Sequence, residues 1–210
     1  MDKLIDDLIK LAFAEDIGDG DHTTLCCIPE TAMGKSQLII KEDGVLAGVE
    51  MAKRIFHDFD PELKMTVFIQ DGAEVKKGDI AFVVEGKIQS LLQTERLMLN
   101  VMQRMSGIAT TTRKYAKALE GTKTHVLDTR KTTPGMRMIE KEAVRIGGGM
   151  NHRIGLFDMI LLKDNHVDFA GGIEQAITRA QNYLKEKGKN LKLSLTHISE
   201  PTRRVVISYA

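Results

Sequence analysis

Residues 128–166 read DTRKTTPGMRMIEKEAVRIGGGMNHRIGLFDMILLKDNH, and this stretch gathers cationic side chains beside turns and strand ends. The basic residues are Arg130, Lys131, Arg137, Lys141, Arg145, His152, Arg153 and Lys163. A solvated surface usually mixes charges of both signs, whereas cations concentrated at turns indicate a bound anion. The stretch therefore predicts a pocket for a polyanionic small molecule.

The chain beyond Gly121 alternates between strand-like and helical patterns. The predicted order is strand 124–129, helix 136–146, strand 159–163, helix 172–187 and strand 191–195. Repeated β-then-α units with apolar strands predict a parallel sheet, either open or closed into a barrel. In such sheets ligands bind at the carboxyl ends of the strands, and both basic clusters follow strands directly. The pocket is expected at that edge.

The first half of the chain has a different pattern. Helical spacing of apolar residues predicts a helix over 3–14, and short β-type runs between 34 and 87 predict antiparallel strands with a helix inserted at 50–58. The segment from 91 to 120 predicts a buried pair of helices joined near Ser106, with its methionines as core residues. A domain seam is expected near 105–120.

Composition excludes several classes of protein. The 210 residues carry a net charge of +1 and 5% aromatic residues, which disfavours a nucleic-acid binder. No apolar run reaches the roughly 18 residues of a membrane span, and the acidic, amphipathic start of the chain is unlike a secretory signal, so we expect a cytoplasmic protein without membrane partners. The adjacent Cys26 and Cys27 are expected to be reduced and semi-buried, because neighbouring cysteines rarely pair.

The chemistry of the basic cluster limits the substrate. Arginine binds carboxylate or phosphate through two parallel hydrogen bonds, and lysine acts as a compact positive charge. These residues suit a substrate with several carboxylates, phosphates or both. The alternative is that Arg137, Lys141 and Arg145 lie along an exposed helix with Glu140 and Glu142 as local partners.

The glycine run 147–149 has two interpretations. Its backbone N–H groups could approach a phosphate, or the run could cap a helix and form a sharp turn. It lacks the pattern of a P-loop or a dinucleotide fingerprint, and no residues have zinc-ligand spacing or form a serine-nucleophile motif. His152, which follows the run and precedes Arg153, is a candidate acid, base or donor to a carboxylate.

These motifs together resemble the quinolinate phosphoribosyltransferase family. The resemblance covers EDIGDGDHTT at 15–24, GVLAGVE at 44–50, DGAEVKKGD at 71–79, TERLMLNVMQRMSGIAT at 94–110 and all of 128–166. It implies the fold class α/β, with an α+β N-terminal sandwich domain and an incomplete parallel β/α barrel. It also implies the transfer of a phosphoribosyl group from phosphoribosyl pyrophosphate to quinolinate. The products would be nicotinate mononucleotide, pyrophosphate and CO2, with Mg2+ accompanying phosphoribosyl pyrophosphate.

The resemblance also implies roles for individual residues. Arg130, His152 and Arg153 are expected to bind the quinolinate carboxylates. Lys131 and Lys163 are expected to act catalytically near the pyrophosphate or the reactive edge of the substrate, with Lys163 also binding substrate. Arg96 is expected to reach the active site of a neighbouring subunit, which implies a homodimer, with assembly into a hexamer left open. No metal-ligating residue is assigned.

The end of the chain departs from the family pattern. Residues 192–197 read KLSLTH, and the later acidic strand-end residues and glycine phosphate loop of the family have no counterpart. The domain prediction is therefore 1–106 for the sandwich with its helical connector, 107–192 for a partial barrel and 193–210 for a non-native tail. We expect such a chain to bind substrates poorly and to turn over slowly or not at all.

Two rival functions stay open. A paralogous phosphoribosyltransferase associated with molybdenum transport shares the scaffold and much of the basic pocket. The chain could instead be a non-catalytic anion-binding fragment, because the acidic half of the site is absent. Quinolinate and nicotinate tested side by side would separate the first rival, and ligand binding without pyrophosphate release would support the second.

Overall fold

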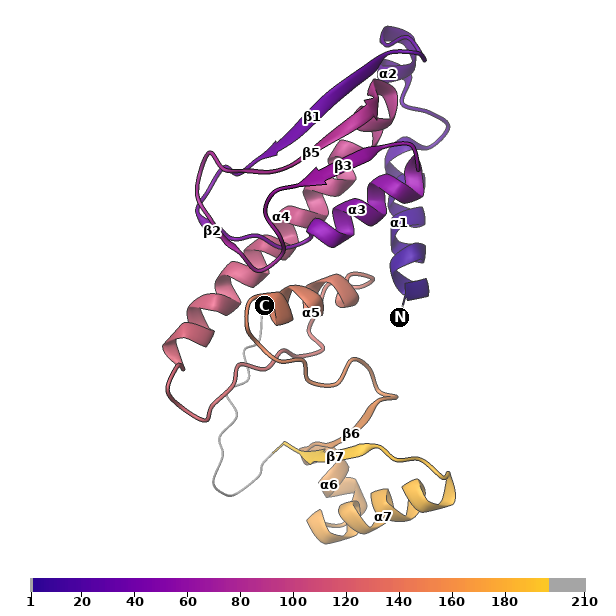
Figure 1. Cartoon of the computed structure of the whole chain (residues 1–210). Coiled ribbons are helices and arrows are strands. Elements are labelled where there is room, and N and C mark those ends of the chain that lie inside the picture. Colours follow the sequence, from indigo (N-terminus) through magenta and orange to yellow (C-terminus); the bar gives the residue numbers. More distant parts are fainter. Residues whose placement is uncertain (1, 197–210) are drawn as a thin grey trace.

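A computed structural model of the chain describes residues 2–196. Its first half is built on a three-stranded antiparallel sheet with the order β1-β5-β3, and Figure 1 shows helices α3 and α4 on one face of that sheet. A second, two-stranded antiparallel sheet pairs β2 with β4. The elements of this half are α1 (Asp2–Ile17), α2 (His22–Cys27), β1 (Met33–Ile39), β2 (Gly44–Val45), α3 (Val49–Phe59), β3 (Lys64–Val67), β4 (Glu74–Val75), β5 (Ile80–Lys87) and α4 (Ile88–Ala118).

The core of this half lies between β5 and the helices. Phe82 on β5 is 1% exposed, and its ring meets Phe56 of α3 edge-on at 6.3 Å between centroids. Helix α4 adds Met98, Met102 and Met105, all buried, so the prediction that the methionines fill the core is confirmed. Each large apolar side chain buried in this way contributes about 1.5–3 kcal/mol.

Helix α4 is one continuous helix of 31 residues, so the predicted break near Ser106 is wrong. The Ser106 hydroxyl accepts a hydrogen bond from Ala47 N at 3.0 Å and donates to Ala47 O at 3.1 Å. Thr110 one turn later accepts from Val45 N at 2.9 Å. These polar residues bond to the β2 segment instead of ending the helix, and a single helical glycine such as Gly107 costs only about 1 kcal/mol.

The second half follows the predicted alternation only in part. Strands β6 and β7 pair in parallel, as predicted, with helices α6 and α7 between them in sequence. Figure 1 shows these four elements as a group set apart from the N-terminal sheet. The predicted strand 124–129 is reduced to one parallel bridge between Leu127 and Met150. The elements of this half are α5 (Arg137–Ile146), β6 (Met159–Leu162), α6 (Asp164–Ala170), α7 (Ile173–Glu186) and β7 (Lys192–Leu195).

Three further predictions concern the ends and the surface of the chain. Of the predicted non-native tail, residues 193–195 belong to β7, and 197–210 lie outside the described residues. Cys26 and Cys27 form no disulfide, as expected, but both are exposed rather than semi-buried, because α2 packs through Thr24 on its other face. Between residues 2 and 196, no helix is both long and apolar enough to cross a membrane.

Helix α5 approaches α4 closely because glycines stand at the contact. A methyl group at Gly147 would lie 2.5 Å from the carbonyl oxygen of Ala109 and 2.7 Å from Cβ of Thr112. At Gly149 it would lie 2.7 Å from Val144 Cγ1 and 2.9 Å from Thr112 Cγ2. Gly147 and Gly149 therefore let the end of α5 rest against the backbone of α4.

This contact predicts opposite effects for two glycine substitutions. Gly147→Ala should lower the free energy of unfolding by about 1–3 kcal/mol, because the new methyl group meets rigid backbone. Gly107→Ala, in the middle of α4 with no atom within 4 Å of the new methyl group, should raise it by about 1 kcal/mol or less. Urea unfolding followed by circular dichroism measures both, and equal effects would contradict the close packing.

Candidate active site

Two loops leave the same edge of the second half. Met150 N donates to Val126 O at 2.8 Å and Asp128 N donates to Met150 O at 3.2 Å, which fixes the parallel bridge between the segments. The chain continues from Asp128 into the 129–135 loop and from Met150 into the 151–158 loop. The bridge therefore starts both basic loops side by side, at the edge where the sequence predicted the pocket.

Arg137 joins these two loops through its guanidinium. It donates to the Thr132 hydroxyl at 3.0 Å, to Ile154 O at 3.1 Å and to Arg130 O at 3.4 Å. The alternative of an exposed helical row is therefore wrong for Arg137, and also for Lys141, which is 2% exposed. It holds only for Arg145, which pairs with Glu142 at the surface. Helical spacing alone could not show that one face of α5 is turned inward.

The 151–158 loop is closed by the carboxylate of Asp158. Its two oxygens accept from Ile154 N and Gly155 N, each at 2.8 Å. Burial alone would raise the pKa of Asp158, but these backbone donors outweigh it and lower the pKa. Asp158 therefore stays ionised and holds the two ends of the 154–158 turn together. This fixes the backbone directly after Arg153.

Arg153 and Arg130 bring two positive charges together. Arg153 is 8% exposed, and its guanidinium donates to Met159 O at 3.4 Å. Burial lowers the pKa of Arg153, and the neighbouring Arg130 guanidinium lowers it further, while the Asp158 carboxylate opposes this shift. Over residues 2–196, no carboxylate lies within 4.0 Å of either guanidinium. Two adjacent, partly desolvated cations of this kind favour an anionic ligand.

A buried ion pair lies beneath the two loops. Lys141 Nζ is 2.5 Å from Asp128 Oδ1, and the side chains are 3% and 5% exposed. Asp128 also accepts from His152 N at 2.8 Å, and Lys141 also donates to His152 O at 3.2 Å. Burial raises the pKa of Asp128, while the hydrogen bond from Lys141 opposes the rise. The opposite charges of Asp128 and Lys141 thus neutralise each other beneath the two loops.

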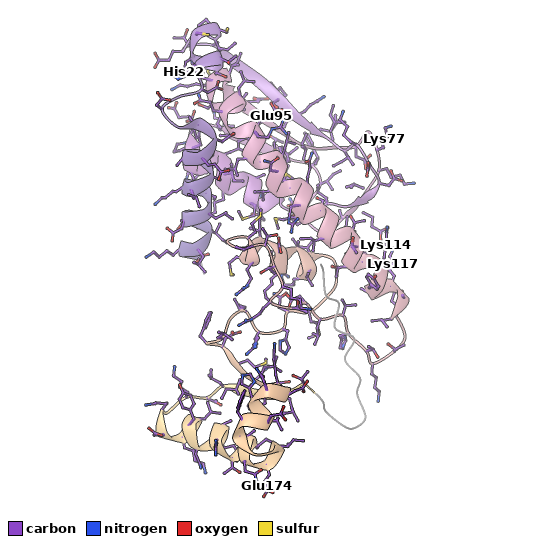
Figure 2. All side chains as sticks on the ribbon, turned by 180° about the vertical axis from the view of Figure 1, so that it is seen from behind. His22, Lys77, Glu95, Lys114, Lys117 and Glu174 are labelled. Carbon is purple, nitrogen blue, oxygen red and sulfur yellow. The ribbon has the colours of Figure 1, made fainter. Side chains whose placement is uncertain are left out.

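The other predicted site residues lie farther apart. Lys131 is exposed on the 129–135 loop, and Lys163 is exposed directly after the carboxyl end of β6. Arg96 is exposed on α4 beside Glu95, which Figure 2 labels on the part of α4 that packs against the N-terminal sheet. Within one chain the structure therefore brings Arg130 beside Arg153, with His152 next to Arg153 along the chain, but it does not bring Arg96 to them.

The glycine run does not offer a phosphate cradle. Gly147 N, Gly148 N and Gly149 N donate to Ala143 O, Arg145 O and Val144 O, each at 3.0 Å. Gly147 is the C-cap of α5, so the interpretation as a helix end is confirmed and the phosphate interpretation is wrong. A backbone N–H that already bonds to a helix carbonyl has no hydrogen left for an anion.

Sequence reasoning missed a second support of the 129–135 loop. Arg104 of α4 donates to Glu140 Oε1 at 2.6 Å and to the Thr133 hydroxyl at 2.7 Å. Thr133 N donates to the other oxygen of Glu140 at 3.2 Å. The signal in the sequence was an acidic residue, Glu140, inside a basic stretch, but only the packing of α5 on α4 shows its partner.

The described residues supply no ready site for a resident metal ion. Residues 2–196 contain no group of three or more His, Cys, Asp or Glu side chains placed to hold one. Asp128 and Asp158, the carboxylates beside the two loops, already accept hydrogen bonds from the protein. Within residues 2–196, these side chains therefore do not form a ligand set for a protein-bound Mg2+.

Sequence comparison identifies related domains across the chain. The family description "Quinolinate phosphoribosyl transferase, N-terminal domain" matches residues 21–106, and "Quinolinate phosphoribosyl transferase, C-terminal domain" matches 108–204. The chain is 47% identical over 180 residues to quinolinate phosphoribosyltransferase [decarboxylating] 1 of Nicotiana glauca, covering 85% of this chain and 51% of the relative. It is 44% identical over 204 residues to the chloroplastic nicotinate-nucleotide pyrophosphorylase [carboxylating] of Arabidopsis thaliana, covering 97% of this chain and 58% of the relative.

Solved structures agree with these relatives. NadC from Streptococcus pyogenes superposes with a TM-score of 0.84 at 40% identity, covering 92% of this chain and 68% of that one. The nicotinate-nucleotide pyrophosphorylase from Francisella tularensis gives a TM-score of 0.80 at 35% identity, covering 94% and 69%. The chain spans about half the length of the Nicotiana and Arabidopsis relatives that it matches.

The Arg104 support predicts a difference between two arginines. Arg104→Met should lower the free energy of unfolding by about 2–3 kcal/mol, because it leaves the buried Glu140 carboxylate without its charged partner. Arg145→Met breaks an exposed pair with Glu142 and should change it by less than about 1 kcal/mol. Urea denaturation of both variants gives the comparison, and an Arg104 effect no larger than the Arg145 effect would contradict this role.

Proposed function

Since the chain belongs to the quinolinate phosphoribosyltransferase family, we propose that it transfers a phosphoribosyl group from phosphoribosyl pyrophosphate to quinolinate and releases pyrophosphate and CO2. The observation that carries the proposal is the pair of neighbouring guanidiniums, Arg130 and Arg153, without a carboxylate partner in residues 2–196. Quinolinate is a dicarboxylate, and two arginine side chains offer one planar fork to each carboxylate. His152, at the start of the 151–158 loop, would be a further donor.

The roles follow from where the charges develop. Arg130, His152 and Arg153 would hold the carboxylates so that the ring nitrogen faces the ribose carbon in line with the leaving pyrophosphate. Lys131 and Lys163, exposed at the two strand ends, would stabilise the negative charge of that pyrophosphate. Loss of CO2 is then favoured by the positive charge on the pyridinium ring of the adduct.

Three further parts of the proposal concern partners and location. We propose that Mg2+ binds together with phosphoribosyl pyrophosphate, because the described residues hold no carboxylate cluster for the ion. We also propose a homodimer, because Arg96 is exposed on α4, apart from the loops of its own chain, and would reach the site of a neighbouring subunit. The proposal also places the chain in the cytoplasm, although the Arabidopsis relative is named chloroplastic.

The reaction itself is the first prediction to test. With quinolinate, phosphoribosyl pyrophosphate and Mg2+, the purified chain should form nicotinate mononucleotide and release pyrophosphate, which chromatography and a coupled phosphate assay measure. Nicotinate in place of quinolinate should give no product, because it lacks the second carboxylate. Product from nicotinate alone would favour the paralogous transferase, and binding without pyrophosphate release would favour an anion-binding fragment. The slow turnover expected from the sequence stays a prediction, which the same assay decides.

Arg153 should decide the affinity for the dicarboxylate. Arg153→Lys keeps the charge but removes the planar fork, so the dissociation constant for quinolinate should rise about tenfold, which corresponds to about 1.4 kcal/mol. Arg145→Lys, on the exposed side of α5, is the matched control and should leave the constant unchanged. Isothermal titration calorimetry measures both, and equal dissociation constants for the two variants would contradict the assignment.

A further inference from the structure

The two backbone polar groups of His152 are both held by one buried ion pair. Its N–H donates to Asp128 Oδ1 at 2.8 Å, and its carbonyl accepts from Lys141 Nζ at 3.2 Å. The neighbouring Asn151 amide, with its nitrogen turned toward these acceptors, donates to Asp128 Oδ2 at 2.8 Å and to Lys141 O at 2.9 Å. Rotation of either peptide unit that flanks His152 therefore breaks a hydrogen bond to one member of the ion pair.

The pair itself is unsuited to bind the substrate. Its side chains are 3% and 5% exposed, and the two opposite charges cancel each other. Stability alone does not explain it either, because well-packed apolar side chains of similar volume often replace a buried ion pair without loss of stability. The pair instead fixes the relative positions of three segments. It connects Asp128, at the end of one strand-like segment, to the loop that begins at Asn151 and to helix α5.

Arg153 depends on the same contacts because it follows His152 directly. Arg153 is 8% exposed and lies near Arg130, so a rotation of the preceding peptide would move its side chain away from that position. We propose that Asp128 and Lys141 are positioning residues, which clamp the His152 peptide so that His152 and Arg153 face the dicarboxylate substrate. This inference rests on the proposed function for the identity of the substrate, but the clamp itself is a property of the described contacts.

The test removes both charges together. In the double variant Asp128→Ala with Lys141→Met no unpaired buried charge remains, so the chain is expected to fold. The dissociation constant for quinolinate should rise at least about tenfold, because small misplacements of binding groups have large effects. The dissociation constant for pyrophosphate, assigned to Lys131 and Lys163, should change little. Isothermal titration calorimetry with each ligand measures this selectivity.

The matched control is another ion pair of the same chemistry. Lys35→Met with Glu85→Ala removes an exposed pair, 2.6 Å apart, that joins β1 to β5, and it should leave both dissociation constants unchanged. Equal weakening of both ligands in the Asp128 and Lys141 variant would show a purely structural role, and an unchanged quinolinate constant would also overturn the proposal. If that variant does not fold, Lys141→Arg replaces it, because the longer planar fork keeps the charge but moves the donors.

A second measurement separates this inference from the proposed function. Amide hydrogen exchange followed by NMR should become faster at His152 in the double variant, whereas Met150 N, which donates to Val126 O at 2.8 Å, should keep its exchange rate. If the unsubstituted chain binds no quinolinate, the proposed function fails and the exchange data decide the clamp. Unchanged exchange at His152 would then overturn it.

Discussion

The close contact between α5 and α4 is the constraint on which the second half of the structure depends. Gly147 and Gly149 leave no side chain between the end of α5 and Thr112 of α4, so the two helices can approach until backbone meets backbone. Arg113 strengthens the contact by donating to Gly147 O at 3.0 Å and to Ile146 O at 3.2 Å, which satisfies carbonyls that a helix end leaves free. Because α5 carries Arg137, Glu140 and Lys141, its position on α4 sets the positions of both loops of the candidate site.

Helix α4 extends this constraint to the first half of the chain. Its N-terminal part is buried against the antiparallel sheet, and near its middle Ser106 and Thr110 bond to the segment that includes β2. Its last part carries Lys114 and Lys117, which Figure 2 shows along the same stretch of helix, and Lys117 pairs with Glu74 of β4 at 2.6 Å. A single continuous helix thus connects the N-terminal sheet to the two loops of the candidate site, and Arg96 lies on its exposed surface in the part nearer the sheet.

The charged residues of the candidate site differ in the partners they have within the protein. Lys141, Arg137 and Arg104 are cations whose donors are bonded to protein oxygens, and they hold the loops in place. Arg153 and Arg130 have no carboxylate within 4.0 Å in residues 2–196, and they are the cations left to meet an anion. The difference arises because Asp128 and Glu140 are buried beneath the loops, where each neutralises one neighbour in a weakly screened environment.

The sequence by itself determined the types and order of most elements, and it predicted the part of the chain that is proposed to bind the anion. Helical and alternating apolar patterns are local, so α3, α5, α7 and the parallel pair β6 and β7 could be predicted from neighbouring residues. The tertiary structure alone decided that α4 is unbroken, that the 124–129 segment forms one bridge, that Gly147–Gly149 cap a helix and that Lys141 faces inward to Asp128. These outcomes depend on which surfaces pack together, and residue spacing along one helix or loop carries no information about the partner on another.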